Sequence, residues 1–177
     1  VFEWNGAEVK QANYQGDVGL HIAKAIWGMK QNEGKMQKEN DDLKKKVEFL
    51  GKSYADGASA YENLEFKEEI EKINEKVYDR SDEEINKLYD LGKKWSLDYF
   101  ETVYKKLGTK FDRYFFESGA ASDGLDIVKK HPDVFVESDG ATVFRGEEHG
   151  LHTRVFVSSK GLPTYEAKEL GVNKKKF

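Results

Sequence analysis

Tyr165 and Glu169 are the two residues whose types and spacing best fit a chemical task. They lie in the stretch "PTYEAKEL" and are four residues apart, so a helix here would place both side chains on one face. A carboxylate can accept two parallel N–H bonds from a guanidinium, while an aromatic ring packs against the planar cation. The pair could therefore bind a guanidinium, although an exposed Tyr beside a surface Glu is the commoner meaning of this spacing.

A second candidate is the turn "NYQGDVG", which contains Asn13, Gly16, Asp17 and Gly19. Weak alternation before the turn predicts a strand, and helical spacing after it predicts a helix. In an open α/β sheet, a carboxylate at the carboxyl end of a strand can hold an amine or hydroxyl of a ligand. Alternatively, Asp17 caps the helix by accepting hydrogen bonds from its free amides. We interpret Asp17 as a cap or orienting residue rather than a catalyst.

The segment Glu147–His152, "EEHGLH", brings two acids and two imidazoles into a short stretch. These side chains can ligate metals, but Gly150 argues against a helix that would pair the two histidines. We interpret the segment as a polar connection between strands and assign no metal site.

Three zones must position these candidates. Residues 1–29 predict a strand, a turn and a helix, and residues 110–177 predict further strands and helices, including a hairpin around Ser138–Gly140. A helix from Pro163 to Gly171 follows, since Pro favours the start of a helix and Gly its end. Residues 30–109 carry apolar residues at helical spacing. A helical block between α/β zones is typical of an α/β domain with an insertion.

Within the helical block, "SDEE" predicts the start of a helix, with Ser81 as its cap and Glu84 reaching back. "KMQKE", residues 35–39, superficially resembles the K-M-S-K-S nucleotide motif, but it lies at the entrance to the helical block and we interpret it as coincidence.

Composition limits the classes of protein. The chain of 177 residues has a net charge of −4, without a basic block of the kind that binds nucleic acid. It has no Cys, which excludes disulfides and thiolate chemistry. With neither a membrane-length apolar run nor a secretory leader, the sequence predicts a soluble cytoplasmic protein. The start at Val1 and the end at "ELGVNKKKF" lead us to expect an internal piece of a longer protein.

Several motifs together resemble arginyl-tRNA synthetases, which are class I aminoacyl-tRNA synthetases. They are "NYQGDVG", "SLDYFETVYKKLGTKFDRYFFES", "VFVESDGATVFR" and "RVFVSSKGLPTYEAKELG", which occur in the family's order. The resemblance implies a partial Rossmann-like catalytic domain interrupted by a largely helical insertion. Residues 1–29 would be part of the nucleotide-binding domain, residues 30–109 the connective insertion, and residues 110–177 the return to the catalytic domain.

The family's activity implies ATP, with Mg²⁺, L-arginine and tRNA(Arg) as substrates and partners, and a parent enzyme that works as a monomer. In the family, a Tyr and an acid on the helix after the final "TY" contact the substrate arginine, and the corresponding residues are Tyr165 and Glu169. Glu169 stands where Asp is more usual. The family's H-x-G-H and K-M-S-K-S elements are absent from the chain, so we expect the catalytic residues to lie outside it and the isolated chain to be inactive.

An alternative reading is a non-catalytic module that binds tRNA or protein with a synthetase-derived fold. A self-contained nucleotide-binding protein is disfavoured, because the chain contains no phosphate-cradling Gly-rich loop.

Overall fold

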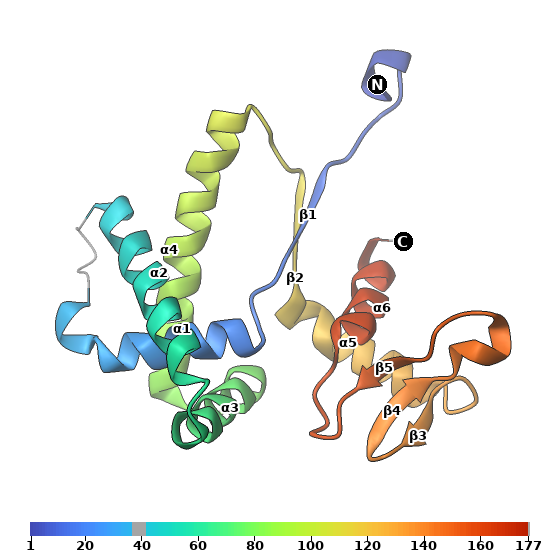
Figure 1. The fold of residues 1–177 in the computed structure, drawn as a ribbon. Helices are drawn as coiled ribbons and strands as arrows, with labels where there is room; N and C mark the ends of the chain where they lie inside the picture. The colour runs from blue at the N-terminus through green and yellow to red at the C-terminus, as the bar shows by residue number, and fades with distance from the viewer. Residues whose placement is uncertain (37–41, 177) are drawn as a thin grey trace. The chain divides into compact units, whose positions relative to one another are not determined.

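A computed structural model describes residues 1–36 and 42–176 of the chain (Figure 1). The chain divides into two compact units. The helical unit comprises Asp17–Asp112, and the mixed unit comprises Val1–Gly16 together with Arg113–Phe177. The first boundary between these compact units therefore precedes the first long helix, and the domain boundary expected after residue 29 stays a prediction. The boundary between the units lies there because that helix packs against the other helices of its unit. "KMQKE" falls partly outside the described residues.

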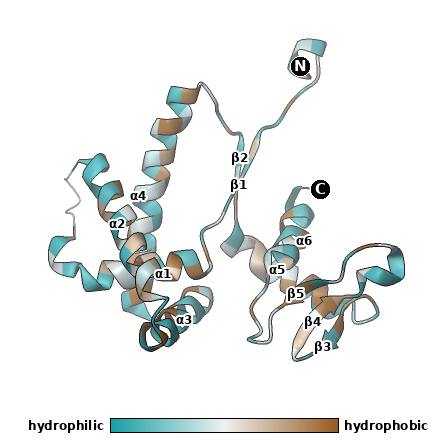
Figure 2. Cartoon of the chain, in the orientation of Figure 1, coloured by the Kyte–Doolittle hydropathy of each residue, from teal (hydrophilic) through white to brown (hydrophobic). Residues whose placement is uncertain are grey.

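The helical unit is built from α1 (Leu20–Gln31), α2 (Leu43–Ala60), α3 (Leu64–Asp79) and α4 (Glu83–Leu107), with a short 3-10 helix η2 (Glu33–Lys35) after α1. Each long helix carries both hydrophilic and hydrophobic residues (Figure 2), as expected of helices with one buried face. Helix α1 contacts α2, α3 and α4. The core of the unit consists of Val18, Ala23, Ile26, Trp27, Ile70, Ile73, Val77, Ile85 and Tyr89, with a second cluster of Met29, Phe49 and Trp95.

Helix α4 begins one residue later than "SDEE" predicted. Its cap is Asp82, whose carboxylate accepts hydrogen bonds from the backbone amides of Glu84, at 3.0 Å, and Ile85, at 3.1 Å. The prediction of Ser81 as the cap was therefore wrong. A hydrogen bond from Lys76, together with these amides, holds the pKa of Asp82 below its ordinary value.

We expect Asp82→Ala to lower the midpoint of thermal unfolding, because two first-turn amides lose their acceptor. Ser81→Ala, the control, should change it far less. The pKa of Asp82 is lower in the folded chain than its ordinary value. The ionised carboxylate therefore stabilises the folded chain above the ordinary pKa, and this stabilisation is lost as the pH falls through the lowered pKa. Thermal melts of both variants at neutral and acidic pH check this, and equal melts for the two variants would contradict it.

The mixed unit contains a parallel pair of strands, β1 (Ala12–Gln15) and β2 (Arg113–Phe116), and an antiparallel sheet of β3 (Val136–Ser138), β4 (Ala141–Phe144) and β5 (Arg154–Val157). Its helices are α5 (Glu117–Lys130) and α6 (Tyr165–Lys176), with 3-10 helices η1 (Glu3–Asn5) and η3 (Gly146–His149). The predicted hairpin is confirmed. Asp139 and Gly140 both have positive φ, of 50° and 76°, as a two-residue type I′ turn requires.

Helix α6 differs from its prediction at both ends. Pro163 precedes the helix and forms a bridge with Val157, and the helix continues through Gly171 to Lys176. Gly171 does not end the helix because α5 crosses it closely there. A Cβ on Gly171 would lie 2.1 Å from the carbonyl oxygen of Ala120, and one on Gly124 would lie 2.0 Å from that of Ala167. These glycines let the two helix backbones touch.

Among the residues that the structure describes, no helix is both long and apolar enough to cross a membrane.

Candidate functional site

The parallel strands of the mixed unit define the edge at which the candidate site lies. Gln15 pairs with Phe116 at the end of both strands, so Gly16 and Glu117 are the next residues along each chain segment. Carboxyl ends of parallel strands meet at one edge of a sheet, which is where ligands bind in open α/β folds. Asn13 lies two residues before the end of β1 and is paired with Tyr114.

Tyr165 and Glu169 share one face of α6, as their spacing predicted. Thr164, just before the helix, donates its hydroxyl to the carbonyl oxygens of Val155, at 2.6 Å, and Phe156, at 3.1 Å, which attaches the start of α6 to β5. Tyr165 is 60% exposed, whereas Glu169 is half-buried. A hydrogen bond between the Tyr165 hydroxyl and the Glu169 carboxylate, followed by the negative charge of Glu169, raises the pKa of Tyr165. Their role in binding arginine stays a prediction.

Glu117 and Lys168 form an ion pair that the sequence analysis did not predict. The Lys168 ammonium donates to the Glu117 carboxylate at 2.6 Å, and the side chains are only 8% and 16% exposed. Glu117 directly follows β2 and opens α5, so the pair links the first half of α6 to the sheet edge. The two residues are 51 positions apart, so no local spacing indicates the pair. What the sequence offers is an acid directly after a predicted strand and a lysine between acids in "YEAKEL".

Asp17 belongs to the helical unit, where it joins the start of α1 to α4. The N-cap of α1 is Gly19, so the prediction of Asp17 as the cap was wrong. Instead, the Asp17 carboxylate is 6% exposed and accepts hydrogen bonds from the Tyr89 hydroxyl, at 2.8 Å, and the Lys93 ammonium, at 2.5 Å. The alternative of an orienting residue fits this geometry, because both donors come from α4 and hold the segment just before α1.

The predicted residues are thus divided between the units. Asn13, Gly16, Tyr165 and Glu169 lie in the mixed unit, and Asp17 and Gly19 lie in the helical unit.

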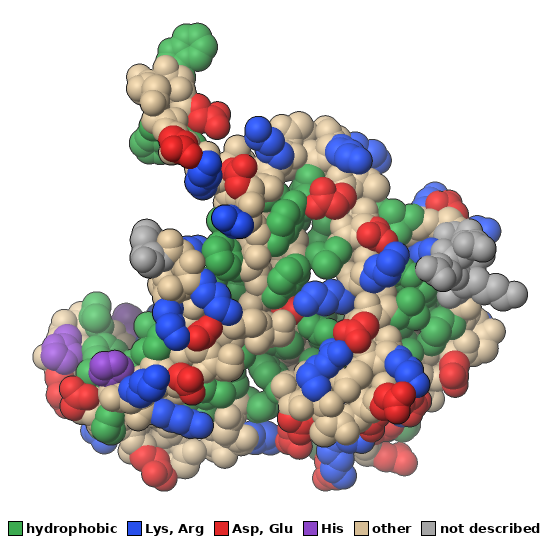
Figure 3. All heavy atoms as spheres, turned by 180° about the vertical axis from the view of Figure 1, so that it is seen from behind, with side chains coloured by type: hydrophobic (Ala, Val, Ile, Leu, Met, Phe, Trp, Pro, Cys, Tyr) green, Lys and Arg blue, Asp and Glu red, His purple; other side chains and the backbone are tan. Residues whose placement is uncertain are grey.

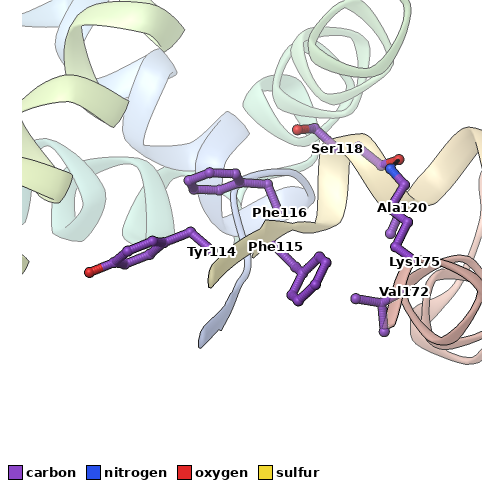
Figure 4. A pocket seen from close by; sticks show the side chains of 8 residues that line it. Tyr114, Phe115, Phe116, Ser118, Ala120, Val172 and Lys175 are labelled. Carbon is purple, nitrogen blue, oxygen red and sulfur yellow. Dashed lines mark hydrogen bonds between the residues drawn. The ribbon is translucent and has the colours of Figure 1, made fainter. Parts of the chain in front are cut away.

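A hollow of about 240 Å³ lies beside the sheet edge of the mixed unit (Figure 4). It is lined by the aromatic residues of β2, the first turn of α5, and Val172 and Lys175 of α6. Figure 4 shows the Phe115 ring beside Val172, on the side of β2 that faces α6. The Lys175 ammonium donates to the carbonyl oxygen of Gly119 and pairs with Asp123. The hollow is therefore a mainly apolar gap between packed elements, and it does not include Tyr165 or Glu169.

The segment Glu147–His152 connects β4 to β5 and contains η3. Glu147 accepts hydrogen bonds from the amide and hydroxyl of Thr153, and the hydroxyl bond is the main reason that the pKa of Glu147 lies below its ordinary value. His149 stacks on Phe144 with ring centroids 5.6 Å apart. Histidine side chains gather at one end of the face seen in Figure 3, where basic and acidic side chains are interspersed. Within the described part of the chain, no group of three or more His, Asp or Glu side chains could hold a metal ion.

The proteins to which the chain is similar belong to one class, the ligases that attach amino acids to tRNA. No family model matches the chain. Its fold is similar to a segment of arginyl-tRNA synthetase from Plasmodium falciparum, with a TM-score of 0.71 and 18% identity over 99% of this chain and 29% of that one. A protein from Campylobacter jejuni described as a putative arginyl-tRNA synthetase gives a TM-score of 0.56 with 18% identity, covering 97% of this chain and 36% of that one.

Within that class, the curated relatives are arginine–tRNA ligases. The protein from Porphyromonas gingivalis is 26% identical over 100% of this chain and 33% of its own length. The protein from Bdellovibrio bacteriovorus is 27% identical over 73% of this chain and 23% of its own length. The resemblance to arginyl-tRNA synthetases that the motifs indicated is therefore confirmed, and the chain spans about a quarter to a third of the length of these relatives.

Proposed function

We propose that this chain is part of the catalytic domain of an arginine–tRNA ligase. The observation that carries the proposal is the similarity to arginine–tRNA ligases, which extends over the whole chain in the Porphyromonas gingivalis protein. The parallel pairing of β1 with β2, strands separated in the sequence by α1–α4, supports a Rossmann-like domain with a helical insertion. The protein would act as a monomer in the cytoplasm, where tRNA is charged.

The proposed reaction has two steps. In the first, a carboxylate oxygen of L-arginine attacks the α-phosphorus of ATP, and the bond to the departing pyrophosphate breaks. In the second, a terminal ribose hydroxyl of tRNA(Arg) attacks the arginyl carbonyl and releases AMP. Catalysis of this kind depends on holding the reacting groups in line and on stabilising developing charge. ATP with its Mg²⁺ is a substrate here, and we assign no metal ligand, because the described residues form no metal-binding group.

In this proposal, Tyr165 and Glu169 hold the arginine side chain. The Glu169 carboxylate has the charge and the two oxygens that bidentate binding of a guanidinium requires. Tyr165 is 60% exposed, so its ring is open to pack against the planar cation. Because Glu is one methylene longer than the Asp usual in the family, the carboxylate of half-buried Glu169 can still reach outward to a ligand.

Isothermal titration of L-arginine into the purified chain tests the proposal. We expect arginine to bind, and Glu169→Ala to weaken binding about ten- to hundredfold, the usual cost of losing a hydrogen-bonded charge. L-Lysine and uncharged L-citrulline should bind more weakly than L-arginine. Glu166→Ala, which removes a neighbouring acid from the same helix, is the matched control and should retain the affinity.

Two results would count against this function. Equal affinities for the wild-type chain and Glu169→Ala would exclude Glu169 as the guanidinium ligand. A wild-type chain that binds neither arginine nor lysine would contradict an arginine site within this chain, and would favour the alternative of a non-catalytic module that binds tRNA or protein.

A further inference from the structure

The Glu117–Lys168 ion pair is unusually enclosed for a contact between helices. A second pair links the same two helices, with Lys174 of α6 lying 2.8 Å from Asp123 of α5, and its side chains are 57% and 25% exposed. The Glu117–Lys168 side chains, at 2.6 Å, are 16% and 8% exposed. Removing two charges from water costs much of what their attraction returns, so an enclosed pair is seldom explained by stability alone.

The ion pair lies next to the proposed arginine site. Lys168 follows Tyr165 by three residues, so their side chains are neighbours on α6. Glu117 lies close enough to Tyr165 for its charge to act on the phenol, as do the charges of Glu169 and Glu166. The ammonium of Lys168 is thus a cation that belongs to the protein, held beside a site that we expect to bind a cation from the ligand.

We propose that Glu117 is a positioning residue for arginine recognition, holding the Lys168 ammonium away from Tyr165 and Glu169 so that the ligand's guanidinium meets the Glu169 carboxylate without a competing cation. This inference rests on the proposed arginine site. Glu117 suits the task because it lies in the first turn of α5, where the helix dipole favours the ionised carboxylate.

The proposal predicts that one substitution damages the site and a second repairs it. Glu117→Gln keeps the shape of the side chain but releases the Lys168 ammonium, which can then turn to Glu169 and repel the guanidinium. The affinity for L-arginine should fall by about tenfold or more, as expected for a like charge placed beside a ligand. Adding Lys168→Met removes the released cation, so the double variant should regain most of the lost affinity.

The test is a calorimetric titration of L-arginine into three proteins: the wild-type full chain, Glu117→Gln, and Glu117→Gln/Lys168→Met. Asp123→Asn, which breaks the exposed pair between the same helices, is the matched control and should bind as the wild type does. Helical circular dichroism of each variant establishes that it is folded. Weaker binding by the double variant than by Glu117→Gln would overturn the proposal, because a merely structural pair loses affinity with each change. Unchanged affinity in Glu117→Gln would overturn it as well.

A second readout needs no arginine. The pKa of Tyr165 can be followed by nuclear magnetic resonance of ¹³C-labelled tyrosine, with Tyr165→Phe to assign the signal. Loss of the Glu117 charge by itself lowers the pKa of Tyr165 in Glu117→Gln, so the double variant carries the test. A released cation beside the phenol favours the phenolate, and its removal by Lys168→Met should raise the pKa again. If the wild-type chain does not bind arginine, the proposed function fails, and this titration still decides whether Glu117 holds the Lys168 ammonium away from Tyr165. A pKa of Tyr165 that is the same in Glu117→Gln and in the double variant would overturn that placement of Lys168.

Discussion

Gly28→Ala is expected to destabilise the helical unit by about 3 kcal/mol or more, at or beyond the upper end of what overpacking a core usually costs. A Cβ at residue 28 would lie 1.9 Å from the carbonyl oxygen of Ser53. That oxygen is part of the α2 backbone, which cannot rotate away as a side chain can. Helices α1 and α2 would have to separate along their contact, and Gly57, whose own Cβ would lie 2.0 Å from the Lys24 carbonyl oxygen, shares that contact.

Urea unfolding followed by tryptophan fluorescence measures this effect, because Trp27 and Trp95 are both buried in the helical unit. Gly51→Ala is the control. Gly51 lies in α2 with nothing within 4 Å of an added Cβ, so alanine there should stabilise the helix by about 0.5–1 kcal/mol. Unfolding of Gly28→Ala at the same urea concentration as the wild-type chain would contradict the close contact between the backbones of α1 and α2 at Gly28.

Asp17→Ala is expected to cost about 1.5–3 kcal/mol of folding free energy, the range for losing hydrogen bonds to a charged group, because the Lys93 side chain is 26% exposed and its ammonium can be partly solvated in the variant. Asp17 is 6% exposed and accepts from both the Tyr89 hydroxyl and the Lys93 ammonium. Its loss leaves both α4 donors without this acceptor. Asp17→Asn should cost less, because an amide oxygen can still accept from Tyr89 while the attraction to Lys93 is lost.

Asp98→Ala is the matched control for Asp17, since Asp98 forms an exposed ion pair with Lys94 on α4. Exposed pairs of this kind contribute about 1 kcal/mol at most. The midpoints of urea unfolding should therefore fall clearly for Asp17→Ala and hardly at all for Asp98→Ala. A stable Asp17→Ala chain would show that Asp17 does not anchor the turn, and would restore the interpretation of its carboxylate as a group for binding a ligand.

Local patterns were enough to predict many of the elements. The strand before Gly16, the helix after Gly19 and the hairpin around Gly140 all depend on neighbouring residues, and the structure has each of them. Predictions of element ends were weaker. Ser81 and Gly171 both carry signals of a helix end, yet the cap falls on Asp82 and α6 runs past Gly171. A glycine that ends a helix and a glycine that admits a neighbouring backbone look the same in a sequence.

The sequence by itself determined the spacing of Tyr165 and Glu169 on one helical face, the turn "NYQGDVG" between a strand and a helix, and the resemblance to arginyl-tRNA synthetases. Only the tertiary structure decided the partners of the two enclosed carboxylates, Asp17 and Glu117. Lys93 lies 76 residues from Asp17, and Lys168 lies 51 residues from Glu117. Periodicity reports which side chains share a face of one element, but a buried charge is stabilised by whichever opposite charge the packing of several elements brings beside it.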